Sequence, residues 1–275
     1  MGENLTYGEQ AAIWNKDMNI DFKAYDAHMR GHECFYRFNK EDNSQARIYY
    51  QQSIDIEPSA IVYVMIGFTH LMDLMYGWSE SPIESFDKAD KCSVSACELN
   101  DNIDLVLILD GWITLYKGMH DKAVEVCRRA VQLNPNGAEA HVHLGTMLVY
   151  AGNAVEAVRL INRGLRLNPT PPSYYYDILG TAYQDTHQFK EAVSALKCSI
   201  RLNPNGLPPY LTLASCYGFM NQMEKAHQAV ADTLRMDPHY CLDQFALTQP
   251  YKDKERLNAY LDSLRKAGLP EHPPE

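Results

Sequence analysis

The chain of 275 residues lacks the features of several large protein classes. It has no basic excess, because 25 lysines and arginines stand against 35 aspartates and glutamates, for a net charge of −10. Nucleic acids and anionic membranes attract basic surfaces, so neither is expected as the main partner. No apolar run approaches the roughly 18 residues that a membrane-spanning helix needs. We therefore expect no contact with nucleic acid or membrane.

Signals for export, disulfides and catalysis are also missing. The seven cysteines are an odd number with no C-x-x-C pair, which favours reduced thiols in a cytoplasmic protein. The opening MGENLTYGEQ has neither the basic region nor the apolar core of a secretory signal. The phosphate-loop, serine-hydrolase and zinc-protease motifs are absent from the chain. We expect no catalytic residues, no cofactor and no metal, and so no enzyme.

What the sequence does contain is a repeat of about 34 residues. Leu-Asn-Pro occurs at 133–135, 167–169 and 202–204, and Met-Asp-Pro follows at 236–238. An alanine precedes each of these prolines by 12 residues. Every unit also has a small residue at one further equivalent position. That small residue is, in order, Gly31, Gly67, Gly111, Gly145, Gly180 and Ala214. Such a period, with small residues at fixed places and a closing proline, is typical of tetratricopeptide repeats.

The repeat predicts an all-α fold, a tetratricopeptide superhelical solenoid of about six helix-turn-helix units over residues 23–238. The small residues would let helices A and B of a unit approach closely, and the proline would end helix B. The interval from Gly67 to Gly111 is 44 residues instead of 34 to 36, and it predicts an insertion at about 74–86, between helices A and B of the second unit.

Flanking segments complete the predicted organisation. Residues 1–22 are expected to form an N-terminal helix or linker, since Thr6 and Glu9 fit a capping box. Residues 239–275 are expected to form a C-terminal capping helix and tail. The helix would cover Asp253 to Ala267, and Gly268 and Pro270 would stop it. A solenoid needs such polar caps at its ends.

Several motifs outside the repeat consensus carry a further resemblance. They are Ala24-Tyr25-Asp26 with Arg30-Gly31, Tyr76-Gly77-Trp78, Pro171-Pro172 before Tyr174-Tyr175-Tyr176, Pro250-Tyr251-Lys252-Asp253, and Leu264 to Pro270. Together they resemble the C-terminal repeat region of bacterial class III adenylate/guanylate cyclases and related signalling proteins. The resemblance covers nearly the whole chain. It implies a regulatory or scaffolding region, and no metal-binding aspartate or nucleotide segment of a cyclase has a counterpart here. The chain thus resembles an excised domain or a free-standing relative.

Candidate binding residues follow from the helical period. With the small residue counted as position 8, positions 5, 9 and 13 of helix A share one face, which lines the concave groove of such arrays. This stripe, with neighbouring position 6, is apolar and aromatic in the N-terminal half and more acidic in the C-terminal half. The predicted partner-binding residues are His28, His32, Tyr36, Phe68, Ile108, Trp112, Tyr116, His143, Tyr150 and Asp177.

The expected function is a protein-protein interaction or regulatory module that binds a protein or peptide in this groove. Burial against the next repeat or the N-terminal helix is the alternative for Trp112, Tyr116, Phe68 and Met72. His28 and His32 have a spacing that could share a metal, but no third ligand lies nearby. The alternative function is a self-associating scaffold, a homodimer made by the apolar half of the groove or by the terminal helices. An enzyme site in the groove is a third possibility, with no triad or paired carboxylate to support it.

Overall fold

The structure is a computed structural model that describes residues 21–273, and within that range every regular element is an α-helix. The predicted N-terminal helix and its capping box lie outside the described residues. The described chain forms two compact units, one up to Ala140 and one from His141 onward. Each unit is described by itself.

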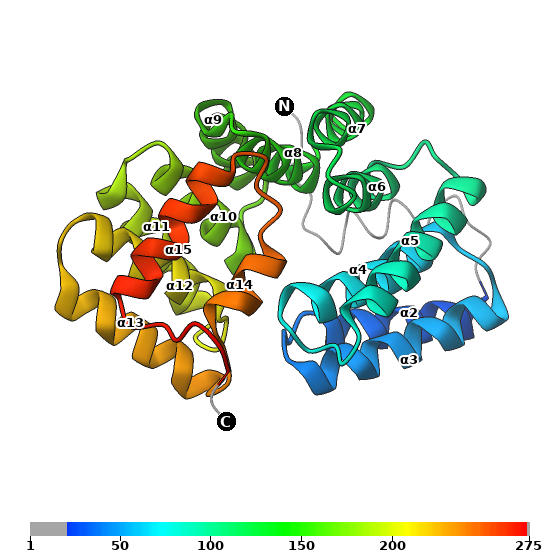
Figure 1. Cartoon of the computed structure of the whole chain (residues 1–275). Helices are drawn as coiled ribbons and strands as arrows, with labels where there is room; N and C mark the ends of the chain where they lie inside the picture. The colour runs from blue at the N-terminus through cyan, green and yellow to red at the C-terminus, as the bar shows by residue number, and fades with distance from the viewer. Residues whose placement is uncertain (1–20, 274–275) are drawn as a thin grey trace. The chain divides into compact units, whose positions relative to one another are not determined.

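Unit 1 contains three consecutive helix pairs (Figure 1). Each pair consists of a helix A and a longer helix B that returns along it. The pairs are α2 (Phe22–Phe35) with α3 (Lys40–Ile56), α4 (Ala60–Met75) with α5 (Pro82–Leu99), and α6 (Asp104–Tyr116) with α7 (His120–Leu133).

Unit 2 continues the same pattern and adds two helices. Its pairs are α8 (Ala138–Ala151) with α9 (Ala154–Leu167), α10 (Ser173–Asp185) with α11 (Phe189–Leu202), and α12 (Pro208–Phe219) with α13 (Met223–Met236). Helix α8 begins three residues before the boundary of the unit. The short helix α14 (Leu242–Thr248) and helix α15 (Lys254–Lys266) follow the last pair.

The small residues predicted to bring helices together lie at those contacts. A Cβ atom added to Gly180 would stand 2.5 Å from Leu196 Cγ of the paired helix, and one added to Gly31 would stand 2.6 Å from the Tyr50 ring. At Gly145 the added atom would meet Ile161 Cγ1 at 2.5 Å and the Ala157 carbonyl oxygen at 3.3 Å. The close approach of helices A and B therefore depends on the missing side chain.

The Leu-Asn-Pro tripeptides coincide with the ends of the B helices. Helices α7, α9 and α11 end at Leu133, Leu167 and Leu202, the first residue of each tripeptide. The residue before a proline is pushed out of the helical region, and the proline has no N–H to donate. The tripeptide is thus a helix stop, and it sets the length of each unit.

The long second repeat places its extra residues differently from the sequence prediction. Only residues 76–81 separate α4 from α5, whereas α4 has 16 residues and α5 has 18. The extra chain therefore mostly lengthens the two helices. In the short loop the Tyr76 and Trp78 rings stack with centroids 4.9 Å apart. Arg47 of α3 pairs with Asp73 of α4 at 2.5 Å, which ties the first two repeats together.

Candidate functional site

A row of aromatic rings runs along the A-helix stripe of unit 1, which we define as positions 5, 9 and 13 of α2, α4 and α6. On α2 the ring centroids of His28 and His32 are 5.2 Å apart, and those of His32 and Tyr36 are also 5.2 Å apart and stacked. These side chains keep partial exposure, up to 37% for Tyr36. The i, i+4 spacing of a helix produces this row.

Both histidines of the row are neutral at neutral pH. Burial lowers the pKa of His28 to about 4. Burial, together with the neighbouring His28, lowers the pKa of His32 to about 3. Desolvation penalises the charged imidazolium, so the pair presents uncharged rings. In the described residues no group of three or more histidines, cysteines or carboxylates could hold a metal ion.

The rest of the unit 1 stripe is more buried than the row on α2. Ile108 is fully buried and Trp112 is 5% exposed, while Phe68 and Tyr116 are half-buried. Trp112 stacks on Tyr116 with ring centroids 6.2 Å apart. Contact of Ile108 and Trp112 with a partner stays a prediction, and their packing gives them a role in stability as well.

In unit 2 the chain's own C-terminal segment, residues 249–269, lies on the corresponding stripe. Helix α15 packs along α12 (Figure 1). Lys252 N–H donates to the Tyr150 carbonyl oxygen at 2.9 Å, and the Tyr150 and Tyr251 rings meet edge to face with centroids 5.1 Å apart. Position 13 of α8 is therefore occupied from within the chain.

Polar contacts fix the same segment to α10 and α12. Arg256 Nη1 lies 3.0 Å from Asp185 Oδ2, and the Asp185 side chain is only 3% exposed. The Tyr260 hydroxyl donates to Thr212 Oγ1 at 2.7 Å, and Ser263 and Ser215 share a buried hydrogen bond of 2.6 Å. These contacts fall on positions 6, 9 and 13 of the A helices. The repeat pattern predicted a partner on that face.

Asp177, at position 5 of α10, has an unusual environment beneath this segment. Its Oδ1 is buried and accepts no hydrogen bond. Burial raises the pKa of Asp177 to about 7, and burial likewise raises that of Asp185 to about 6 even though Arg256 opposes the shift. Asp177 and Tyr150 are half-buried with the C-terminal segment in place. His143 lies elsewhere on α8, where its ring stacks on Tyr174 with centroids 5.9 Å apart.

Sequence reasoning missed the residues that cover unit 2. Tyr251, Arg256, Tyr260 and Ser263 were not candidates, although Pro250-Tyr251-Lys252-Asp253 had been singled out as a motif. A repeat pattern says which face of helix A is free within the repeats. It cannot say that a segment beyond the last repeat folds back onto that face.

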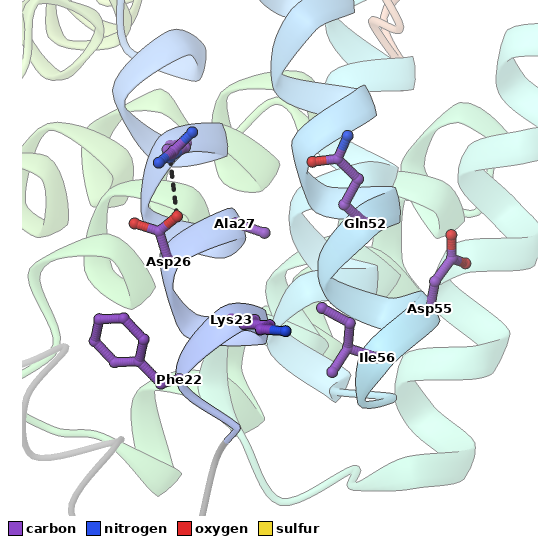
Figure 2. Close-up of a pocket in the computed structure, with 8 residues that line it drawn as sticks. Phe22, Lys23, Asp26, Ala27, Gln52, Asp55 and Ile56 are labelled. Carbon is purple, nitrogen blue, oxygen red and sulfur yellow. Dashed lines mark ion pairs between the residues drawn. The ribbon is translucent and has the colours of Figure 1, made fainter.

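A shallow pocket of about 460 Å³ lies at the outer edge of the first helix pair (Figure 2). Its rim carries the exposed Phe22 and an exposed ion pair of 2.9 Å between Asp26 and Arg30. Charges of both signs surround it, and they point to no single ligand chemistry. Its lining residues are Phe22, Lys23, Asp26, Ala27, Arg30, Gln52, Asp55 and Ile56.

Comparison with known proteins identifies the repeat. Residues 115–180 match the tetratricopeptide repeat family. No curated protein matches the chain significantly. Over the helices described, none is long and apolar enough to cross a membrane.

Solved structures of the same architecture are numerous. The APC/C hetero-tetramer Cut9–Hcn1 is 17% identical with a TM-score of 0.59, over 82% of this chain and 39% of that chain. TTC0263, a thermophilic TPR protein of Thermus thermophilus, is 18% identical with a TM-score of 0.55, over 75% and 100%. PilW, a type IV pilus biogenesis factor, is 20% identical with a TM-score of 0.54, over 74% and 88%. These likenesses show the fold alone. The chain contains a tetratricopeptide-repeat region, and the predicted all-α solenoid class is confirmed.

Proposed function

We propose that this chain is a protein-binding module that takes a peptide or protein segment on the A-helix stripe of unit 1. The observation that carries the proposal is the partly exposed row of rings formed by His28, His32 and Tyr36. Phe68 and Tyr116 add half-buried rings at positions 9 and 13 of α4 and α6. Helical repeat arrays commonly bind partners on extended surfaces of this kind, and exposed apolar patches mark interaction sites.

The chemistry of the stripe indicates the kind of partner. Positions 5, 9 and 13 of α2, α4 and α6 hold no lysine or arginine, and burial lowers the pKa of both histidines to about 4 or below. Recognition of a carboxylate would need a cation. The expected partner segment therefore presents apolar or aromatic side chains, which stack on the rings.

Site-specific photo-crosslinking tests this proposal. A photoreactive phenylalanine analogue replaces Tyr36 on the stripe, and in a matched control it replaces Ile48 on α3, which is 51% exposed. Mass spectrometry identifies the adduct, and fluorescence anisotropy then measures binding of a synthetic peptide from the cross-linked region. Tyr36→Ala should weaken that peptide by roughly thirtyfold, since an interface aromatic contributes about 2 kcal/mol.

Three outcomes are informative. A specific adduct at position 36 and a weakened Tyr36→Ala variant support the proposal. Equal adducts at positions 36 and 48 contradict it. An adduct with a second copy of the chain, together with a dimer mass in light scattering, would establish the self-associating scaffold in place of a module for other proteins.

We further propose that the module belongs to a cyclase-like bacterial signalling protein and regulates it without catalysing a reaction itself. The support is the sequence resemblance through motifs such as Tyr76-Gly77-Trp78. The complete open reading frame tests it, because an adjoining cyclase domain is expected. The purified chain should convert neither ATP nor GTP to a cyclic nucleotide with magnesium or manganese. Turnover that scales with protein after repurification would contradict this.

A further inference from the structure

Unit 2 contains a half-buried residue, Asp177, with one carboxyl oxygen that is buried and has no hydrogen-bond partner. Asp177 Oδ1 is buried without a hydrogen-bond donor, and native proteins rarely leave a buried polar atom unpaired. Two tyrosine hydroxyls that interact electrostatically with Asp177 donate to other acceptors: Tyr260 donates to Thr212 Oγ1 at 2.7 Å, and Tyr150 donates to Gln249 Oε1 at 3.3 Å. An ionised Asp177 would thus place charge on a desolvated oxygen that has no donor beside it.

A repeat helix and the C-terminal segment each bring a tyrosine near this carboxyl, Tyr150 from α8 and Tyr260 from α15. Asp177 is close enough to the Tyr150 and Tyr260 hydroxyls to add to the rise of their pKa values, which burial chiefly causes. Tyr260 belongs to α15, so a residue of the segment lies close to Asp177 of α10. Removing the segment would return Asp177 to water, where its charge is stabilised by solvation.

We propose that residues 249–269 are an internal, releasable ligand of the A-helix stripe of unit 2, and that ionisation of Asp177 weakens their hold. The proposal concerns unit 2 and does not depend on partner binding in unit 1. Buried apolar residues, Leu257, Tyr260 and Leu264, keep the segment docked in most molecules. Ionisation changes how often it opens.

Other titratable groups face the same interface and must be considered together with Asp177. They are Tyr150 on α8, Asp185 on α10, Cys216 on α12, and Tyr251, Asp253, Arg256 and Tyr260 on the segment. Arg256 compensates Asp185 at 3.0 Å. Burial and nearby negative groups raise the pKa values of Cys216 and the three tyrosines, so these four groups stay neutral. Asp177 and Asp185 each have one buried oxygen that accepts no hydrogen bond, but Asp185 has Arg256 beside it, whereas only desolvation shifts the pKa of Asp177.

The direction of the effect follows from linkage. The pKa of Asp177 is raised from its ordinary 3.8 to about 7 in the docked state, and release returns it toward 3.8. The open state therefore gains roughly tenfold per pH unit between pH 4 and 7, and the gain levels off above pH 7. Asp185 adds to the gain of the open state mainly below its own pKa of about 6. Between pH 6 and pH 7 the gain therefore comes mostly from Asp177, because Asp185 is already half ionised at pH 6.

Hydrogen exchange on the full chain tests the proposal. The opening constant of the α15 amides is obtained at pH 6 and pH 7 after correction for the intrinsic exchange rate. The wild-type constant should rise several-fold, and Asp177→Asn should remove most of the rise. Asp262→Asn is the matched control, because Asp262 lies exposed on α15. This variant should show the same rise as the wild type. Circular dichroism confirms that the variants fold.

Two results would overturn the proposal. One is an equal rise in wild type and Asp177→Asn. The other is an equal rise in α15 and in α2 and α3 of unit 1, which would show a general loss of stability. Should Asp177→Asn not fold, carbon-13 titration of the carboxyl groups in the wild-type chain gives the pKa of Asp177 directly. A value near 4 would then refute the inference, and a value near 7 that parallels the opening of α15 would support it.

Discussion

At the scale of single residues, the two histidines of α2, which we propose for partner binding, also give unit 1 a pH response. The pKa of His32 is lowered from 6.5 to about 3 by burial and by His28. Below its unfolded-state pKa of about 6.5, such a histidine binds a proton in the unfolded chain but not in the folded one. The free energy of unfolding therefore decreases as the pH falls from about 6.5 toward the folded-state pKa. The two histidines should therefore lower the stability of unit 1 in mild acid.

His32→Gln tests this response. The variant removes one group that resists protonation, so its urea midpoint should fall less than that of the wild type between pH 7 and pH 5. Carboxylates contribute equally to both proteins and cancel in the comparison. His120→Gln, on the first turn of α7, is the control. A His32→Gln midpoint that falls as steeply as the wild type's would show that His32 is not desolvated.

Trp112 and Tyr116 should separate stability from binding. Trp112 is 5% exposed, and truncating a buried tryptophan costs about 3–5 kcal/mol. Trp112→Ala should therefore lower the melting temperature strongly. Tyr116→Ala removes a half-buried ring and should cost less stability while weakening capture of the partner. Thermal melts followed by circular dichroism measure the loss of stability. Binding measured on the same samples gives the loss of affinity. Equal losses of stability would place both rings in the core.

At the scale of elements, the contact between helices A and B is set by the small residue of each unit. Gly145→Leu would bring a side chain against Ile161 and the Ala157 carbonyl, where even a Cβ atom has contacts of 2.5 and 3.3 Å. Overpacking of this kind costs about 1–3 kcal/mol. A urea midpoint no lower than that of the surface substitution Lys190→Gln would contradict the assigned packing.

The ion pair of α15 with α10 gives a second prediction at this scale. Arg256→Ala leaves Asp185, 3% exposed, without its cation, and breaking a buried pair costs about 3–5 kcal/mol. Arg235→Ala is the matched control, since its pair with Asp232 is 70% exposed on the arginine side and should contribute at most about 1 kcal/mol. Denaturant melts of the two variants should differ clearly. Similar midpoints would mean that the charge of Asp185 is stabilised by groups other than Arg256.

At the scale of the whole molecule, the two units use the same face of helix A differently. In unit 2 the stripe is covered by residues 249–269 through Tyr251, Arg256 and Tyr260. In unit 1 it carries a partly exposed row of rings on α2. One repeat design thus provides a self-occupied surface and a surface proposed for a partner.

The sequence by itself determined the repeat and the ends of its helices. Leu-Asn-Pro stops a helix wherever it occurs, and a glycine facing Leu196 or Ile161 is required by local geometry. Both signals act within about 34 residues, so periodicity reveals them. The row of rings on α2 follows from the same i, i+4 spacing.

Only the tertiary structure decided which stripe residues stay accessible. Asp177 and the residues of 249–269 lie far apart in the sequence, and no local pattern joins them. Their meeting depends on the summed burial of Leu257, Tyr260 and Leu264, which is a property of the folded chain. Burial also raises the pKa of Asp177 to about 7, because desolvation acts through the whole environment of a group and not through its sequence neighbours.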